Sequence, residues 1–325
     1  MAAKTAINAK NLEALGAERL AELLIEISAG NAVAKRRLRV ELAGAQSPAQ
    51  LVKEVRKRFT MIARSRSFVD WQGVRSLADD LDTHRRAIVE TIAKADPTEG
   101  LDLLWRFMVL APPVLERCDD SSGTLIGIFR EACGDMGDVS LKAGADPTSL
   151  ADQAFAALIA NGYGQFDELI RVLAPALGEA GLGHLKQRMT DLSNQPVTKP
   201  PEKDRVKIGW SPSGPIYADE MAERSRVSTV RLALTEIADA LGDVDAFIEQ
   251  YEEETRMLPK IAAQIARRLL SAPSAGSVAG NRGGQASARQ RQLGVAGFRI
   301  GRRPDRRSRS AGPYRRCAGR AMGVL

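Results

Sequence analysis

Apolar residues recur every three or four positions along most of residues 1–272, the spacing that lines one face of an α-helix. No stretch alternates between apolar and polar residues as a half-buried β-strand would. This pattern predicts an all-α protein with almost no strand. The expected helices cover about residues 12–29, 32–42, 48–62, 74–95, 97–117, 122–140, 147–160, 166–177, 181–193, 219–241, 244–255 and 258–270.

Short polar residues mark the starts of several of these helices. Asn31, Ser47, Asp96 and Asp146 stand where a side chain can accept the free N–H groups of a first turn, and the last three precede a proline suited to the first helical position. The sequence Ala-Asp-Pro-Thr occurs twice, 50 residues apart, which is near the size of a HEAT-type helix pair. Together with short loops, this repeat predicts stacked antiparallel helical hairpins, a HEAT/TPR-like α-solenoid, in preference to a closed bundle.

A proline-rich segment interrupts the helical pattern. Residues 194–216 contain five of the fifteen prolines, which is typical of an extended, exposed connection. We expect Trp210 within it to dock this connection against the helices, or else to fill a small satellite core. The predicted organisation is an N-terminal helical-repeat domain (1–193), a linker (194–217), C-terminal helical hairpins (218–272) and a tail (273–325).

The charge of the chain is distributed unevenly. The formal net charge is +7, yet residues 271–325 hold 12 arginines and a single acid, whereas residues 1–270 hold 35 Lys and Arg against 39 Asp and Glu. The tail has too few large apolar residues to offset the entropy of folding. Its composition therefore predicts either a disordered Arg/Gly-rich arm attracted to nucleic acid or anionic surfaces, or GC-rich DNA translated out of frame after about Ala272. We favour the second interpretation.

Composition also excludes several classes of protein. No run of eighteen apolar residues is present, so we expect no membrane span, and the first fifteen residues lack the apolar centre of a secretory signal. Three unpaired cysteines and two histidines 100 positions apart leave no disulfide framework or His-based metal signature. No Walker loop, dinucleotide-binding motif or nucleophile elbow is found. We expect a cytoplasmic protein that needs no cofactor or metal.

One part of the chain is strongly basic. Between residues 35 and 66, ten Lys and Arg accompany only Glu41 and Glu54. If the basic helices share a face, its field attracts phosphates or an acidic partner. The simpler interpretation is a solvated face, or one paired with the acidic stretch 249–254. The cations of the candidate nucleic-acid-binding face are Lys35, Arg36, Arg37, Arg39, Lys53, Arg56, Lys57 and Arg58.

Residues 64–71, RSRSFVDW, interleave aromatic and arginine side chains at the expected end of a helix. Such a corner can bind an anion or a peptide. The favoured interpretation is structural: a turn in which Phe68 and Trp71 pack inward and Asp70 pairs with an arginine. The residues expected to contribute most to a partner-binding surface are Arg64, Arg66, Trp71 and Trp105.

Two histidines were candidates for ligands or bases. Asp80 and His84 stand four apart on a helix, but a metal needs three or four ligands, so we interpret this pair as part of a solvated helix face. His184 lies between glycines and has no evident partner, so we expect it to be structural or exposed.

The polar turn at residues 118–123 is interpreted as a helix cap, with an Asp or Ser accepting the first N–H groups of the helix that follows. The alternative is an enzyme in which Cys118 is a nucleophile or Asp119 and Asp120 hold Mg²⁺. Cys133 falls on an apolar stripe and is expected to be buried.

Three strings carry a resemblance to a known family: NLEALGAERLAELLIEISAGNAVAKRRLRVELAG, RSRSFVDW and LERCDDSSGTLIGIFREAC. They resemble an uncharacterised bacterial family of unknown function, over about residues 8–270. The resemblance implies an all-helical fold that continues into tetratricopeptide-like hairpins, and it implies no catalytic residue. Where the family continues with Glu/Ala-rich helix, this chain has PSAGSVAGNRGG, which agrees with the out-of-frame interpretation.

These observations lead to three hypotheses of function. The first is a non-enzymatic scaffold that binds a protein or peptide in the groove of a helical stack. The second is a nucleic-acid-binding protein that uses the basic face and the Arg-rich tail. The third is the enzyme centred on Cys118, Asp119 and Asp120.

Overall fold

The computed structural model describes residues 6–197 and 199–271, which belong to one compact unit. The all-α prediction is confirmed, with one short two-stranded hairpin. The helices are α1 (Ala9–Glu13), α2 (Ala17–Ser28), α3 (Ala32–Gln46), α4 (Pro48–Arg64), α5 (Trp71–Ala87), the π-helical turn η1 (Ile88–Ile92), α6 (Ala93–Ala95), α7 (Pro97–Met108), α8 (Ala111–Leu115), α9 (Thr124–Lys142), α10 (Pro147–Ile159), α11 (Leu169–Ser193), the 3₁₀ turn η2 (Glu202–Asp204), α12 (Ala218–Leu241), α13 (Val244–Glu249), α14 (Glu253–Arg256) and α15 (Pro259–Ser271). The predicted tail lies outside the described residues, and so does the proposed out-of-frame translation after about Ala272.

Helix starts follow the predicted caps. The side chain of Asn31 accepts the N–H groups of Val33 and Ala34 at 3.1 and 3.0 Å, and Ser47 accepts that of Gln50 at 3.2 Å. Asp96 and Asp146 cap α7 and α10 in the same way. These contacts satisfy backbone N–H groups of the first turn that have no partner within the helix. Since the capping residue and the N–H group are only two or three residues apart, the sequence could predict these helix starts.

The N-terminal helix differs from its prediction. In place of one helix over 12–29, the chain breaks at Gly16, whose φ of +80° lies in the left-handed region that glycine adopts most readily. The apolar residues that suggested this helix are not fully buried either, since Leu12, Leu15 and Leu24 are exposed. α2 makes few contacts with other described helices, and Leu24, Ile25 and Ile27 on it are exposed.

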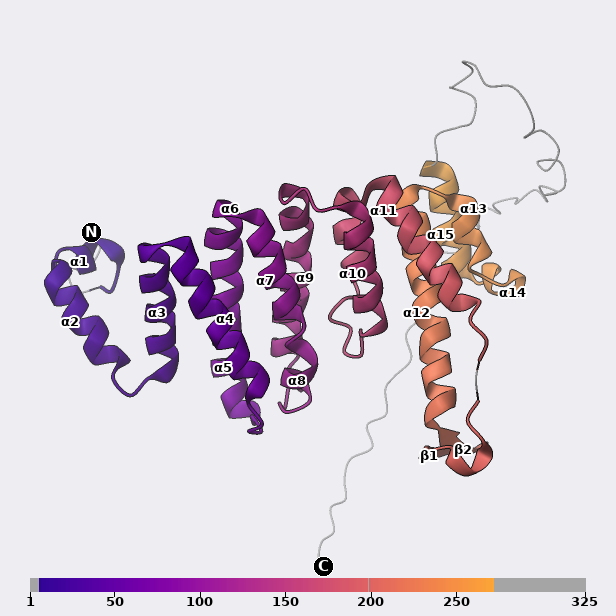
Figure 1. The fold of residues 1–325 in the computed structure, drawn as a ribbon, viewed down its shortest axis with the longest axis horizontal. Helices are drawn as coiled ribbons and strands as arrows, with labels where there is room; N and C mark the ends of the chain where they lie inside the picture. Colours follow the sequence, from indigo (N-terminus) through magenta and orange to yellow (C-terminus); the bar gives the residue numbers. More distant parts are fainter. Residues whose placement is uncertain (1–5, 198, 272–325) are drawn as a thin grey trace, which may run out of the picture. The chain divides into compact units, whose positions relative to one another are not determined.

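Each helix packs against helices close to it in sequence. The main contacts join α3 with α4 and α5, α7 with α9, α9 with α11, α10 with α11, and α11 with α12, and Figure 1 shows these helices side by side in sequence order. One continuous core runs from Val40 on α3 to Ile237 on α12. Three rings lie in contact within it: Phe107 is 5.7 Å from Phe59 and 5.1 Å from Phe129 between ring centroids.

The proline-rich segment contains a hairpin. Strands β1 (Lys207–Ser211) and β2 (Gly214–Tyr217) pair antiparallel, and Arg205 stacks on Tyr217 while it pairs with Asp219 at 3.0 Å. The predicted docking of Trp210 is wrong, since its side chain is 75% exposed. The hydrogen bonds between β1 and β2 and the contacts of Arg205 stabilise this segment, so that the Trp210 indole is not needed for its packing and is exposed to solvent.

Candidate functional site

A buried carboxylate lies between α3, α4 and α5. Asp80 on α5 is 2% exposed. One carboxylate oxygen accepts a hydrogen bond from Nε of Arg36 at 3.0 Å, and the other accepts one from Nε of Arg58 at 2.8 Å. The Nη2 group of Arg58 makes a further short contact with the second oxygen. The prediction of a solvated helix face for Asp80 and His84 is wrong, because helices α3 and α4 cover this side of α5 and bring two arginines onto it.

His84 completes this charge network. It is 1% exposed, and its Nδ1 donates a hydrogen bond to the backbone carbonyl of Asp80 at 2.7 Å. Burial lowers the pKa of His84, so the ring is neutral at pH 7. Since a carbonyl only accepts, the proton of the neutral ring is on Nδ1 and the lone pair is on Nε2. No hydrogen bond to Nε2 is formed by the described residues.

One sequence signal could have revealed the network. Leu77, Leu81 and Ile88 lie on the apolar stripe of residues 71–92. Asp80 and His84 occupy the same stripe at helical spacing, and a carboxylate on a buried stripe needs a cation. The identity of that cation was not predictable, because Arg36 and Arg58 are 44 and 22 residues away in sequence.

Two hollows of different charge flank α3. The first, which we call the basic cavity, lies between α3, α4 and α5 and has a volume of about 350 Å³. Five cations and one carboxylate are in its wall, with His84 and two apolar side chains. Its lining residues are Ala32, Lys35, Arg36, Arg39, Glu54, Lys57, Arg58, Met61 and His84.

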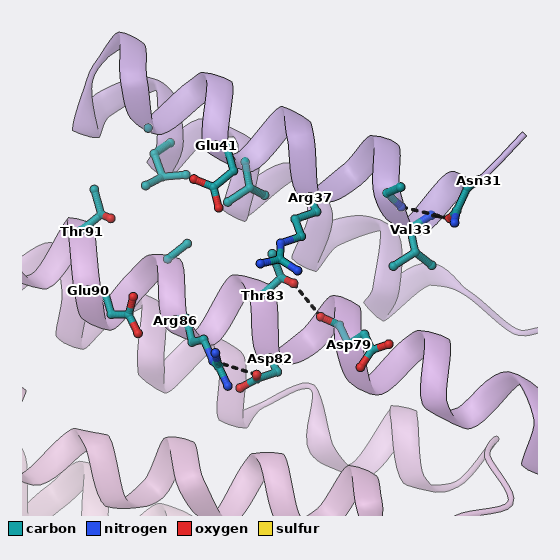
Figure 2. Close-up of a pocket in the computed structure, with 15 residues that line it drawn as sticks. Asn31, Val33, Arg37, Glu41, Asp79, Asp82, Thr83, Arg86, Glu90 and Thr91 are labelled. Carbon is teal, nitrogen blue, oxygen red and sulfur yellow. Dashed lines mark hydrogen bonds and ion pairs between the residues drawn. The ribbon is translucent and has the colours of Figure 1, made fainter. Parts of the chain in front are cut away.

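The second hollow, which we call the mixed groove, lies between α3 and α5–η1 and has a volume of about 580 Å³. Figure 2 shows Arg37 directed from α3 toward α5, among the carboxylates of Glu41, Asp79, Asp82 and Glu90. Asp82 is paired with Arg86 at 2.8 Å, but no ion pair within the described residues holds Arg37. The groove is therefore richer in carboxylates than in cations.

The predicted basic face is divided in the structure. Arg36 and Arg58 share the single carboxylate of Asp80, and Arg56 pairs with Glu99 at 2.7 Å and Asp102 at 3.2 Å. These acids come from α5 and α7, not from the acidic stretch 249–254. Five cations of the face form no ion pair with any described residue: Lys35, Arg37, Arg39, Lys53 and Lys57. Three of them line the basic cavity and Arg37 lines the mixed groove.

The turn between α4 and α5 is held rigidly but leaves its aromatic side chains outside. Val69 exchanges backbone hydrogen bonds with the α8–α9 loop, donating to Arg117 and accepting from Asp119 at 2.9 Å each. Phe68 and Trp71 are 69% and 68% exposed, so the prediction that they pack inward is wrong. Val69 between them is the residue that packs against the core.

Asp70 of the same turn has a different role from the one predicted. It accepts the N–H of Gly73 at 2.9 Å and thereby caps α5, and it forms no ion pair with a described arginine. Arg64 and Arg66 are exposed beside it. Trp105, the fourth expected contact residue, is half-buried on α7 against Phe166, and its indole N–H has no hydrogen-bond partner in the described part of the chain.

The 118–123 turn forms the predicted cap. Both oxygens of Asp120 accept backbone N–H groups at the start of α9, from Leu125 and Ile126 at 2.9 Å each. Burial raises the pKa of Cys118, which favours the thiol over the nucleophilic thiolate. Cys133 is buried as predicted, and its pKa is raised to about 12 by burial.

His184 has a partner that its sequence surroundings did not suggest. Its Nε2 lies 2.9 Å from Asp152 on α10, a carboxylate that also contacts Arg188. No group of three or more His, Cys, Asp and Glu among the described residues is placed to hold a metal ion.

A separate carboxylate, Glu236 on α12, has a raised pKa. Partial burial, and then the nearby charges of Glu168 and Asp167, raise its pKa from 4.5 to about 7. A raised pKa means that the folded state binds the proton more tightly, so this contribution to stability is complete below pH 4.5 and is lost as the pH rises through 7. After allowance for solvent screening, its size is about 1–2 kcal/mol.

We therefore expect Glu236→Gln, which imitates the protonated side chain, to stabilise the protein by about 1–2 kcal/mol at pH 8 and by much less at pH 5. Urea unfolding at the two pH values measures this difference. Glu249→Gln, an exposed position on α13, serves as the control and should change stability by less than about 0.5 kcal/mol at both. A pH-independent effect of Glu236→Gln would contradict the assignment.

Comparisons with known proteins place the chain in a family without indicating an activity. No helix of the described residues is long and apolar enough to cross a membrane. No curated protein and no solved structure matches the chain significantly. The sequence model of one family matches residues 2–279. The chain therefore belongs to the Family of unknown function (DUF6880).

Proposed function

We propose that this protein is a non-enzymatic helical-repeat module that binds another protein. In this proposal the row of helices is an α-solenoid of the HEAT/TPR type, stabilised by contacts between helices close in sequence. Such a module presents side chains on a rigid support and needs no reactive group. We further propose that it acts in the cytoplasm, where free cysteines such as Cys118 and Cys133 stay reduced.

The observation that carries the proposal is the exposed turn at residues 64–71, which we call the aromatic corner. Phe68 and Trp71 together expose two large rings, although the backbone beneath them is fixed by hydrogen bonds to the α8–α9 loop. Aromatic side chains have few rotatable bonds and lose little entropy on binding, and Trp and Arg are enriched among residues that dominate binding energy.

The charge of the corner indicates the chemistry of its partner. Arg64 and Arg66 are exposed and form no ion pair with a described residue. A protein segment that combines apolar side chains with Asp or Glu would cover the rings and pair with the guanidinium groups. The proposed partner is therefore a protein that presents an acidic segment with apolar residues.

The test is a loss of partner affinity in the double variant Phe68→Ser/Trp71→Ser. Cross-linking from the corner in cell extract, followed by mass spectrometry, identifies the partner, and titration calorimetry with both purified proteins measures its affinity. We expect the double variant to bind at least about 30-fold more weakly, the effect of losing one binding hot spot or more.

The matched control is Trp210→Ser, which removes an equally exposed aromatic side chain from the β1–β2 hairpin. It should change the affinity by less than about threefold. Equal affinity of the purified partner for the native protein and for the corner variant would refute the proposal. Binding of the native protein to RNA, but to no protein, would favour nucleic-acid binding by the basic face instead.

A further inference from the structure

We propose that the basic cavity is a binding site for a phosphate monoester, carried by a small molecule or by a side chain of a partner protein. The first argument is charge. Lys35, Arg36 and Arg39 of α3 and Lys57 and Arg58 of α4 line one hollow, and Glu54 is the single carboxylate in its wall. Like charges brought this close repel one another, and a bound dianion removes that repulsion.

The second argument is that two of these cations are held in place. Asp80, buried behind the cavity, accepts Nε of Arg36 and both Nε and Nη2 of Arg58. The Nη groups of Arg36 and the Nη1 group of Arg58 have no partner among the described residues, so they remain available as donors. Fixed guanidinium groups with free N–H donors match the oxygens of a phosphate better than mobile surface cations do.

The third argument is the buried histidine in the wall. His84 is 1% exposed and lines the cavity, and its Nδ1 proton is committed to the backbone of Asp80. Its Nε2 has no partner within the described part of the chain. The Nε2 lone pair is therefore free to accept a hydrogen bond from a hydroxyl group on the organic part of the ligand.

The form of the cavity favours a compact phosphate over a polynucleotide. Its volume of about 350 Å³ accommodates a small organic phosphate, and Ala32 and Met61 provide apolar contacts for the organic part. A nucleic-acid backbone needs cations along an extended path. Here Arg56, the next arginine on α4, is neutralised by Glu99 and Asp102. This inference does not depend on the proposed protein partner.

The test uses titration calorimetry of the full chain at pH 7.5 with four probes: glycerol 3-phosphate, a phosphoserine peptide, the unphosphorylated form of that peptide and a 20-nucleotide RNA. The variant is Arg39→Ala/Lys57→Ala, two cavity cations without an ion pair. The matched control is Arg37→Ala/Lys53→Ala, which removes the same two charges from the same two helices outside the cavity. All four positions are exposed, so both variants should keep the native circular dichroism spectrum and melting temperature.

We expect at least one phosphate monoester to bind, at least about tenfold more weakly to the cavity variant, and within threefold of native affinity to the control. If glycerol 3-phosphate binds more tightly than the phosphopeptide, the ligand is a free metabolite. If the phosphopeptide binds more tightly than glycerol 3-phosphate and than its own unphosphorylated form, the ligand is a phosphorylated protein side chain. The inference is overturned if neither monoester binds, if both variants lose affinity equally, or if only RNA binds.

Discussion

Replacement of Asp80 by alanine is expected to lower the free energy of unfolding by about 3–5 kcal/mol, because it leaves two arginines without a counter-charge in a largely buried place. The side chains of Arg36 and Arg58 are only 25% and 17% exposed, and both guanidinium groups pair with this one carboxylate. Urea unfolding followed by circular dichroism measures the change. A loss of this size is a large part of the total stability of a typical domain.

Two controls distinguish the lost counter-charge from a general effect of substitution. Asp79→Ala, at the exposed neighbouring position, should change stability by less than about 0.5 kcal/mol. Asp80→Ala/Arg58→Met should be more stable than Asp80→Ala alone, because the second change removes one of the unpaired charges. A loss below about 1 kcal/mol in Asp80→Ala would show that the network contributes little to folding.

The second large effect is expected from Phe107→Ala, at about 3–5 kcal/mol. Phe107 on α7 is completely buried and contacts the rings of Phe59 on α4 and Phe129 on α9. Its removal loses the free energy gained by transferring the ring from water into the core. It also leaves a cavity where three helices meet, because neighbouring helices collapse only partly into such a space.

Phe68→Ala provides the matched control, since it removes the same ring from a position that is 69% exposed. It should change the urea midpoint very little, whereas Phe107→Ala should lower the midpoint strongly at an unchanged slope. Similar midpoints for the two variants would mean that the three-ring contact is not part of the core that stabilises this fold.

The local architecture was predictable to a large extent. The helix predicted for residues 147–160 is α10 at Pro147–Ile159, and the caps at Asn31, Asp120 and Asp146 form as expected. All of these features depend on groups within a few residues of one another, so the spacing of residue types contains most of the information.

The candidate sites were predictable only in part. Residues 35–58 were recognised as basic, but the division of their cations between a cavity, a groove and ion pairs with distant acids was not predicted. Phe68, Trp71 and Trp210 were predicted to pack against the protein, but all three side chains are exposed. An aromatic residue is buried only when a neighbouring element covers its ring. The α8–α9 loop pairs with the backbone of Val69 but leaves Phe68 and Trp71 exposed, and the hairpin leaves Trp210 exposed.

The sequence by itself determined that the described chain is helical, where most helices begin, and which stripes are apolar, because hydrogen bonds and periodicity act over three or four residues. Only the tertiary structure decided which stripes are covered and which charges meet. Arg36, Arg58 and Asp80 come together from three helices up to 44 residues apart, and α2 keeps Leu24, Ile25 and Ile27 exposed because few described residues pack against it. Burial and ion pairing are properties of the neighbours that folding supplies, and no local pattern specifies those neighbours.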